Sequence, residues 1–388
     1  MTGKQRMLNA YRGEFNDRVA IAPEFWYYYP AKLLDVDMIA FEREVPFHEA
    51  LKTTFDRFGC EGWGIAFSEV PNDAVQASTS ESWVSEGVLE VATTTTTPHG
   101  DLASRKRYDR HEPSWLVERP IKDLGRDLAA WEAASLGGSP EDMDLSRAQQ
   151  ALDDVGDAYL LEFWMGVPFF DFFAGDREGG FETGIFDFMN PDFIPELERL
   201  QERYTDWMVR LARTCCERTT FESFCIGCSW SCNSLIGPDL WRRWDKPVIR
   251  AVANEVHRHG RLLHIHFHGR CLETVEDFPE IGVDCVCPFE RPPGGDVKDA
   301  ADLRQVASKL AGRTTMNGNV HTVETLIRGN EEAVRGEVRE IMEAYHGNPR
   351  IILGTGDQVG RETPEANLRA MIDEAIRLSP RHHRAAAE

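Results

Sequence analysis

LLHIHFHG, at residues 262–269, is the stretch of sequence that says most about the fold. Side chains two apart on a β-strand point to the same face, so the three histidines share one face while Ile265 and Phe267 share the other. Aliphatic and aromatic side chains suit contact with helices, which leaves the histidine face for the inside of a barrel. We therefore expect a strand with inward-pointing histidines that ends at Gly269.

Similar short β-rich runs alternate with long amphipathic helical stretches through most of the chain. The eight expected strands are Arg18–Phe25, Gly62–Phe67, Tyr159–Met165, Phe221–Gly227, Leu262–His268, Val283–Phe289, Thr314–Asn319 and Ile351–Gly354. The expected helices include Pro191–Arg218, Pro238–His259, Glu324–Tyr345 and Pro364–Arg377. Strands joined by helical crossovers predict an α/β fold, a single (β/α)8 TIM barrel. The rival is a doubly wound open sheet, but no strand is followed by a complete G-x-G-x-x-G.

We expect one domain over residues 1–388, with an insertion. An alternating run, a threonine tract and a Pro-His-Gly turn predict an inserted β-hairpin at residues 78–109. Residues 129–157, rich in Ala, Gly, Ser and Asp, are expected to be a linker-like surface stretch with a short helix. The end of the chain, residues 380–388, is expected to be disordered.

Composition excludes several classes of protein. The chain carries 43 Lys and Arg against 65 Asp and Glu, a net charge of −22, which is too acidic for a nucleic-acid binder. No stretch approaches the roughly 18 apolar residues of a membrane span, and the first residues do not resemble a signal peptide, so we expect a cytoplasmic protein with no membrane partner. Nine cysteines, an odd number scattered along the chain, predict reduced thiols.

The histidine strand is the first candidate for a metal site. Because Gly269 ends it at the carboxyl mouth, where barrel active sites lie, His266 and His268 are nearest the chemistry and His264 is deepest. Imidazoles at positions i and i+2 of a strand are close enough to converge on one ion. The alternative is that these are interior histidines hydrogen-bonded to one another and to water.

Two carboxylates follow other strands. Glu290 comes directly after Val283–Phe289, and Asp357 follows the strand that starts at Ile351. Strand ends are where a barrel places metal ligands and general bases, so both are candidates for either role. Alternatively, each could cap the next helix or bind water.

Other residues suggest weaker candidates. Cys225, Cys228 and Cys232 could bind zinc or an iron–sulfur cluster, but their spacing completes no four-ligand site, and we interpret them as buried packing residues. Aromatic residues crowd the ends of two strands, and aromatic walls suit a flat or bulky organic ligand. We assign as candidate cofactor-binding residues Trp26, Tyr28, Trp164 and Asn319.

The chain as a whole resembles the uroporphyrinogen decarboxylase superfamily, and most closely its branch of cobalamin-dependent methyltransferases. The resemblance runs through nearly the whole sequence, and the order and spacing of its parts make it specific. Its pieces are Met7-Leu8-Asn9-Ala10-Tyr11-Arg12-Gly13, Asp17-Arg18-Val19, the Thr-Thr-Thr-Pro-His-Gly run at 95–100, Pro120-Ile121-Lys122-Asp123, the long helix after Asn190-Pro191, Gly318-Asn319-Val320 and Thr363-Pro364-Glu365-Ala366-Asn367-Leu368.

The resemblance implies a zinc site with altered ligands. The methyltransferases bind zinc through His-x-Cys and a later Cys; here the first motif reads His266-Phe267-His268, and Asp357 stands at the position of the later Cys. We therefore expect a divalent metal held by His266, His268 and Asp357, with Glu290 as a further ligand. A ligand set without thiolate can still bind zinc, and it can also bind iron or manganese.

The expected function is methyl transfer or demethylation on a small organic substrate, with a corrinoid (methylcobalamin) as co-substrate and Asp357 and Glu290 as catalytic residues. The chain lacks the Asp-x-His-x-x-Gly motif of a corrinoid domain, so a corrinoid would arrive on a separate protein or bind free. The sequence is compatible with a homodimer but does not determine the oligomeric state. The alternatives are a metal-dependent lyase, decarboxylase or hydrolase that uses a metal-bound water, and a non-catalytic corrinoid- or porphyrin-binding protein. Porphyrin decarboxylation ranks low because no arginine follows the first strand to clamp carboxylates.

Overall fold

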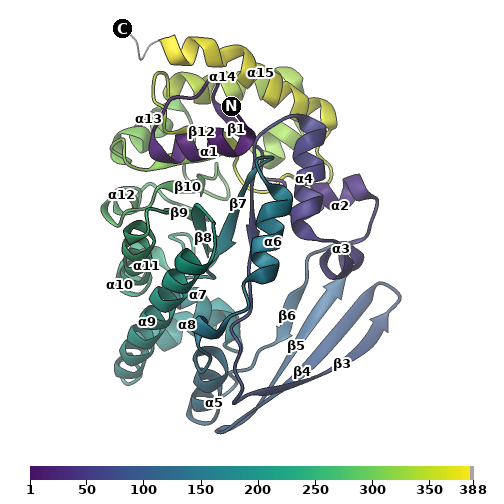
Figure 1. Cartoon of the computed structure of the whole chain (residues 1–388), viewed down its shortest axis with the longest axis vertical. Helices are drawn as coiled ribbons and strands as arrows, with labels where there is room; N and C mark the ends of the chain where they lie inside the picture. Colours follow the sequence, from purple (N-terminus) through teal and green to yellow (C-terminus); the bar gives the residue numbers. More distant parts are fainter. Residues whose placement is uncertain (385–388) are drawn as a thin grey trace.

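A curled sheet of eight parallel strands forms the centre of the protein, and helices cover its outside (Figure 1). The structure is a computed structural model that describes residues 1–384. The strand order is β1-β12-β11-β10-β9-β8-β7-β2, so the first strand of the sheet pairs with the last. The strands are β1 Ala20–Ala22, β2 Trp63–Ala66, β7 Leu160–Trp164, β8 Ser223–Cys228, β9 Leu262–Phe267, β10 Cys285–Pro288, β11 Thr315–Val320 and β12 Ile351–Thr355.

The eight strands lie where the sequence predicts them, and their order is that of a (β/α)8 barrel. The helices that surround them are α1 Gly3–Arg12, α2 Tyr28–Leu34, α3 Met38–Glu44, α4 Phe47–Phe58, α5 Leu124–Leu136, α6 Ser146–Val155, α7 Phe169–Asp176, α8 Gly180–Met189, α9 Ile194–Arg218, α10 Gly237–Trp244, α11 Lys246–Arg258, α12 Asp277–Glu280, α13 Ala300–Lys309, α14 Glu331–Ala344 and α15 Glu365–Arg384. A 3-10 turn at Pro140–Asp142 and a π-helical turn at Thr322–Ile327 complete the helical segments. No helix in the described part of the chain is both long enough and apolar enough to cross a bilayer.

Two long helices expected from the sequence are each divided. The stretch Pro238–His259 breaks at Asp245, because Pro247 lacks an amide hydrogen and is tolerated only in the first turn of a new helix. The stretch Glu324–Tyr345 breaks before Asn330, whose side chain accepts from the backbone of Ala333 and caps α14. Because the apolar periodicity continues through both breaks, the sequence pattern predicts one continuous helix in each case.

The linker expected at residues 129–157 is instead mostly helical. Asp123 caps α5 by accepting from the backbone of Arg126, and α6 follows after the 3-10 turn. Trp131 on α5 is fully buried and donates to Asp176 Oδ2 at 2.8 Å. The alanines that suggested a linker are strong helix formers that here pack against the core.

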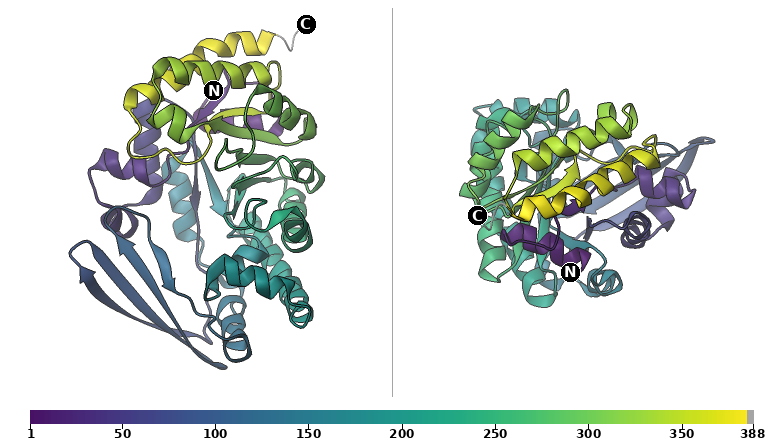
Figure 2. Two further views of the ribbon diagram at one scale, coloured as in Figure 1. Left: turned by 180° about the vertical axis from the view of Figure 1, so that it is seen from behind. Right: turned by 90° about the horizontal axis from the view of Figure 1, so that it is seen from above.

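The insertion is larger than the single hairpin expected at residues 78–109. It is a four-stranded antiparallel sheet of β3 Gln76–Ser85, β4 Val88–Thr97, β5 Gly100–Asp109 and β6 Trp115–Glu118. Figure 2 shows this sheet projecting from the end of the molecule opposite α15. At the other extreme, α15 continues to residue 384, and the remaining residues of the tail expected to be disordered, 385–388, lie outside the described residues.

The two edge strands of the curled sheet, β1 and β2, are linked by one buried carboxylate. Within residues 1–384 no ladder joins these strands; instead Glu61, just before β2, accepts from the backbone of Ile21 in β1 at 2.9 Å. Its carboxylate also accepts from Arg6 at 3.0 Å and from Arg18 at 2.8 and 2.6 Å. The Glu61 side chain is only 2 % exposed, so the seam depends on a shielded ion-pair network.

We predict that Glu61→Ala lowers the free energy of unfolding by about 3 kcal/mol, because it leaves Arg6 and Arg18 without their buried partner. Urea unfolding followed by circular dichroism measures the change. Asp17→Asn is the matched control, because Asp17 also pairs with Arg6 but is exposed, and its loss should cost less than about 1 kcal/mol. Equal effects of the two substitutions would contradict a special role for the seam.

Candidate metal centre

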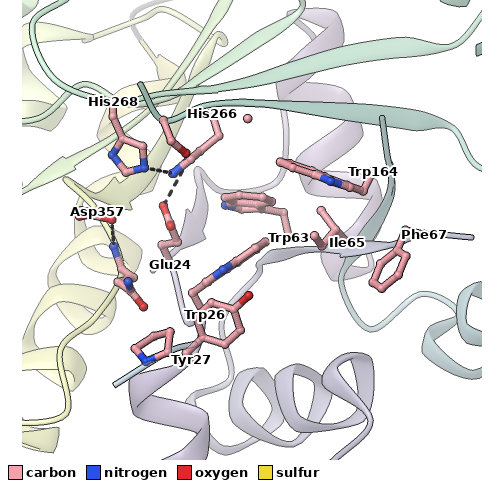
Figure 3. Close-up of a pocket in the computed structure, with 14 residues that line it drawn as sticks. Glu24, Trp26, Tyr27, Trp63, Ile65, Phe67, Trp164, His266, His268 and Asp357 are labelled. Atoms are coloured by element: carbon pink, nitrogen blue, oxygen red, sulfur yellow. Dashed lines mark hydrogen bonds and ion pairs between the residues drawn. The ribbon is translucent and has the colours of Figure 1, made fainter. Parts of the chain in front are cut away.

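The ends of four parallel strands bring acidic and histidine side chains together. Glu24 follows β1, His268 follows β9, Glu290 follows β10 and Asp357 follows β12. Because the carboxyl ends of parallel strands open at the same edge, residues more than three hundred positions apart share one site. Figure 3 shows three of them, Glu24, His268 and Asp357, around the cavity together with His266.

Strand β9 has the alternation that the sequence predicts. Phe267 points outward, with ring centroids 5.7 Å from Trp241 and 5.1 Å from Phe278, both on the surrounding helical layer. His264 lies inside and is completely buried. The histidine face therefore looks into the sheet's interior, with His264 deepest.

His266 and His268 face each other through their outer ring nitrogens. The two Nε2 atoms are 2.8 Å apart. Ligand atoms of both histidines and of Asp357 all lie within 4.8 Å of one another. The structure thus brings together three of the four metal ligands expected from the sequence.

The fourth expected ligand, Glu290, lies behind this group. Its Oε1 is 2.7 Å from Nδ1 of His268, the ring nitrogen that faces away from His266. Because a carboxylate only accepts, Nδ1 of His268 carries a proton, and Nε2 can act as a metal ligand once it loses its own proton. A carboxylate behind a ligating histidine is the usual way to orient the ring and increase its basicity, so this position suits a supporting residue better than a ligand.

A buried hydrogen-bond chain determines the tautomer of His266 in the same way. Glu162 Oε2 is 2.8 Å from His264 Nδ1, and Cys287 Sγ lies 3.1 Å from His264 Nε2 and 3.0 Å from His266 Nδ1. Since Glu162 accepts, His264 carries its proton on Nδ1, and the Cys287 thiol donates to His264 Nε2. The Cys287 sulfur then accepts from His266 Nδ1, and Ser223 donates to the other Glu162 oxygen at 2.6 Å. His266 is left with a free lone pair on Nε2.

The Nε2 atoms of both histidines therefore point toward the same place. Because the pKa of His268 is raised to about 9, its Nε2 carries a proton and donates a hydrogen bond to Nε2 of His266 at 2.8 Å. This proton fills the place between the rings in the metal-free protein, and a divalent ion can replace it. Two imidazoles and one carboxylate, with a further position open to the cavity, are the donor set of catalytic zinc sites.

The electrostatics of the site favour cations. Burial raises the pKa of Glu24 well above its ordinary value and also raises that of Asp357. Burial and the two neighbouring histidines lower the pKa of His266. Burial also acts to lower the pKa of His268, but its hydrogen bond to Glu290 and the nearby carboxylates outweigh this, and the pKa is raised to about 9. A divalent ion would favour the ionised form of these carboxyl groups and would take the place of the His268 proton.

Asp357 has a strained backbone. Its φ is 148°, a region that residues with a side chain rarely adopt. Thr355 holds it there by donating to the Asp357 carbonyl at 2.6 Å while accepting from the backbone of Glu24 at 3.0 Å. Gln358 N donates to Asp357 Oδ1 at 2.6 Å. Strain of this kind is typical of functional sites, because the surrounding contacts must hold the residue in place.

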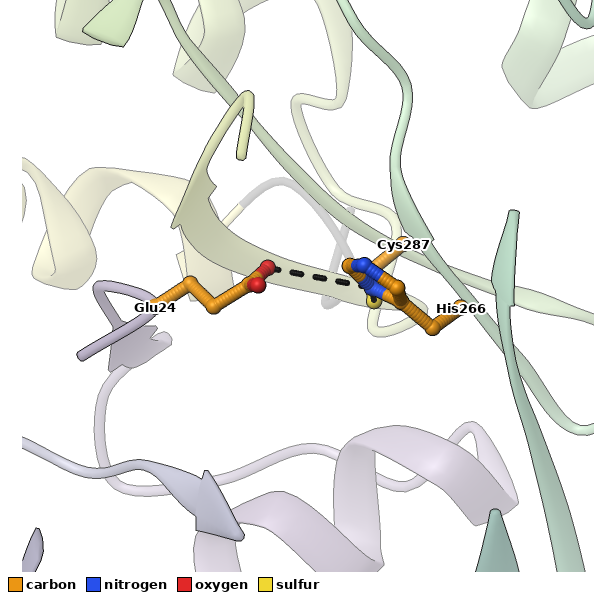
Figure 4. A group of neighbouring side chains, drawn as sticks. All are labelled: Glu24, His266 and Cys287. Carbon is orange, nitrogen blue, oxygen red and sulfur yellow. Dashed lines mark hydrogen bonds and ion pairs between the residues drawn. The ribbon is translucent and has the colours of Figure 1, made fainter. Parts of the chain in front are cut away.

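A second set of donors lies on the inner side of His266. Figure 4 shows Glu24 and Cys287 beside this ring; Glu24 Oε2 is 3.8 Å from Nδ1, and Cys287 Sγ is 3.0 Å from the same atom. Both side chains are buried, and burial raises the pKa of the Cys287 thiol well above its ordinary value. An ion here would have to displace that thiol proton and the chain that depends on it, so the outer set is the better site.

A cavity of about 560 Å³ opens in front of the cluster. Trp26, Trp63 and Trp164 form aromatic walls, and Glu24 and Asp357 contribute acidic groups. Its lining residues, all in the described part of the chain, include no lysine or arginine. Trp164 can lie against the strand only because residue 227 is glycine, since a Cβ there would be 2.4 Å from the indole.

Of the four cofactor-binding residues expected from the sequence, two line the cavity and two lie outside it. Trp26 and Trp164 line the cavity. Tyr28 does not; its hydroxyl donates to Glu112 at 2.5 Å, because α2 begins at this residue and turns it away. Asn319 is fully buried and donates to the carbonyl of Phe289 at 3.0 Å, so it supports the strand ends without lining the cavity.

Sequence reasoning missed three residues of the site. Glu24 follows β1 as Asp357 follows β12, and that shared position could have identified it. Trp63 and Cys287 could not be found this way, because their proximity to His266 depends on how the parallel strands align, with Cys287 paired to His266 in register.

The cysteines suspected of forming a cluster are separate. Cys228 and Cys232 pack in the main hydrophobic core. Cys225 lies apart from them, next to Glu162 and His264 inside the sheet, where all three side chains are buried.

Comparisons with known proteins agree with this architecture. The family model described as uroporphyrinogen decarboxylase (URO-D) matches residues 194–378. A uroporphyrinogen decarboxylase from Burkholderia thailandensis is 26 % identical over 105 residues, which cover 27 % of this chain and 26 % of that protein. A uroporphyrinogen decarboxylase from Burkholderia mallei is 25 % identical over a segment of the same length. The match thus spans only about a quarter of these relatives.

One solved structure matches almost the whole chain. A methyltransferase from Methanosarcina mazei aligns over 97 % of this chain and 98 % of its own with a TM-score of 0.61 and 15 % sequence identity. At that identity the match shows the fold. The family model and the two relatives agree with the resemblance to the uroporphyrinogen decarboxylase superfamily that the sequence motifs indicate.

We predict that Cys287→Ala weakens binding of a divalent ion by about 10- to 100-fold, because both histidines next to Cys287 lose their partner and the His266 tautomer is released. Cys287→Ser should bind almost normally, since a hydroxyl can accept from His266 and donate to His264. Competition with a chromophoric chelator measures the affinity. Equal losses in the two variants would contradict a hydrogen-bonding role and would favour sulfur as a direct ligand.

Proposed function

We propose that this chain, which resembles the uroporphyrinogen decarboxylase superfamily and has a fold like that of a methyltransferase, is a metal-dependent methyltransferase or demethylase on a (β/α)8 barrel. The observation that carries the proposal is the pair of Nε2 atoms, 2.8 Å apart, beside Asp357 at the mouth of an aromatic cavity. The substrate would be a small organic molecule that bears a methyl group, or accepts one, at a heteroatom.

His266, His268 and Asp357 would hold the ion, and Glu290 would orient His268. Zinc fits two imidazoles and a carboxylate, and iron or manganese would also accept this thiolate-free set. When bound, the ion supplies Lewis-acid chemistry that lowers the pKa of a substrate heteroatom. Because nitrogen and oxygen donate less charge than sulfur, this set favours a substrate oxygen over a thiol.

The remaining groups of the cavity have distinct roles. Glu24 is the lining carboxyl group outside this ligand set; because burial favours its protonated form, it can give that proton to the substrate heteroatom when the methyl group leaves. The tryptophan walls would position the methyl-bearing part of the substrate and exclude water from it. Asp357 would act as a ligand, and Glu290 through His268, rather than as free general bases.

The corrinoid co-substrate would approach from outside. A cavity of about 560 Å³ suits one drug-sized ligand, so a macrocycle with its side chains would have to meet the substrate at the rim. A separate corrinoid protein, or free cobalamin, would then present it there. The sequence itself contains no Asp-x-His-x-x-Gly motif that would hold a corrinoid.

Decarboxylation of a porphyrin is less well supported. A substrate with many carboxylates needs cationic partners, and the cavity instead presents Glu24 and Asp357 with two histidines. A lyase or hydrolase acting on a smaller, less anionic substrate remains the second candidate, because the same metal ligands could serve it.

We predict about one divalent ion per chain in protein purified with added zinc, and loss of that ion in the variant His266→Ala/His268→Ala. Inductively coupled plasma mass spectrometry measures the content. His99→Ala is the matched control, because this histidine is exposed on the inserted sheet. Unchanged metal content in the double variant would refute the assignment.

Asp357→Gly is a sharper form of the same test. Glycine relieves the strained φ, so unfolding free energy should rise by about 1 kcal/mol while the ion is held more weakly. A variant that is more stable yet binds metal poorly separates a ligand from a structural residue. Loss of stability together with intact metal binding would contradict both roles.

A further inference from the structure

A second cavity, of about 600 Å³, adjoins the one in front of the metal cluster. It is bounded by α3, α4, α6 and strand β5 of the inserted sheet, which Figure 1 shows on the same side of the molecule. Four residues line both cavities: Tyr27, Ile65, Phe67 and Pro113. The two spaces therefore meet at a common wall.

The shared wall is aromatic and open. Phe67 is 63 % exposed, although it is a large apolar side chain, and Figure 3 shows it at the far side of the metal cavity from His268. Phe41 and Phe47 extend the aromatic surface into the second cavity. A flat apolar body lying across this wall would cover surface that is otherwise exposed to water.

The two cavities differ in the charged side chains that line them. The metal cavity has acidic lining groups and no lysine or arginine, whereas the second cavity has both Lys106 and Arg147. Lys106 Nζ lies 5.0 Å from the ring centroid of Tyr108. Hydrogen bonds from Ser146, and to a smaller extent the charge of Arg147, lower the pKa of the Asp144 carboxyl group.

One acidic residue, Glu42, also lines this cavity and accepts from the backbone of Ser114 at 2.8 Å, so the two cations face a single carboxylate. In a chain of net charge −22, a largely apolar cavity lined by two cations and one carboxylate is unusual.

We propose that the second cavity binds the distal part of the substrate, an apolar and preferably aromatic body that ends in an anionic group such as a carboxylate or sulfonate. Lys106 and Arg147 would hold the anion through charge-assisted hydrogen bonds. The connection to the metal rests on the proposed function, because the reacting methyl group would lie at His266 and His268. The anion site itself rests on the cavity and its two cations.

The fluorescent probe 1-anilinonaphthalene-8-sulfonate tests the site directly, because it joins an aromatic body to one sulfonate. We expect Lys106→Gln and Arg147→Gln each to weaken its binding about tenfold, from the loss of a hydrogen bond to a charged group. Binding of N-phenyl-1-naphthylamine, the same body without the sulfonate, should be unchanged. Arg313→Gln, an exposed cation outside both cavities, is the protein control.

Val45→Trp adds a test of location. Val45 lines only the second cavity and is half-buried, so a larger side chain can fill the space without disturbing the core. We expect it to block both probes. Unchanged sulfonate binding in Lys106→Gln and Arg147→Gln, or unchanged binding of both probes in Val45→Trp, would overturn the proposal. Metal content should be normal in all these variants, so this result is independent of whether the metal assignment holds.

Discussion

The metal chemistry proposed for this protein depends on two imidazole nitrogens, of His266 and His268, that face each other at 2.8 Å. Neither ring is free to turn away, because Glu290 fixes one tautomer and the chain from Glu162 through His264 and Cys287 fixes the other. Each support is buried or half-buried, so water cannot easily replace it. A cation is the group that makes such an arrangement favourable.

The parallel sheet explains why so distant residues can meet. Short strands that all end at one edge place Glu24, His268, Glu290 and Asp357 around the same opening, and the ion pairs of Glu61 join β1 to β2 across the seam. The inserted sheet then adds a wall beside that opening, through Pro113 between β5 and β6. The parallel sheet thus supplies the reactive side chains, and the inserted sheet contributes to the shape of the cavity in front of them.

Local patterns predicted much of this from the sequence. Apolar runs and alternation placed the eight strands and the inward face of the histidines, because these features depend on neighbours along the chain. The roles of Glu290 and Cys287 could not be predicted, since they depend on the register between β9 and β10. Tyr28 was assigned to the cavity because it follows a strand, but the start of α2 turns it toward Glu112. Composition also misled at residues 129–157, where alanines form helices.

An anomalous difference map from crystals of the metal-loaded protein, recorded at the absorption edge of the metal, tests the central claim most directly. We expect a single strong peak between Nε2 of His266, Nε2 of His268 and the Asp357 carboxylate. The contradicting result is the absence of a peak there, or a peak on the other side of His266 between Nδ1, Glu24 and Cys287.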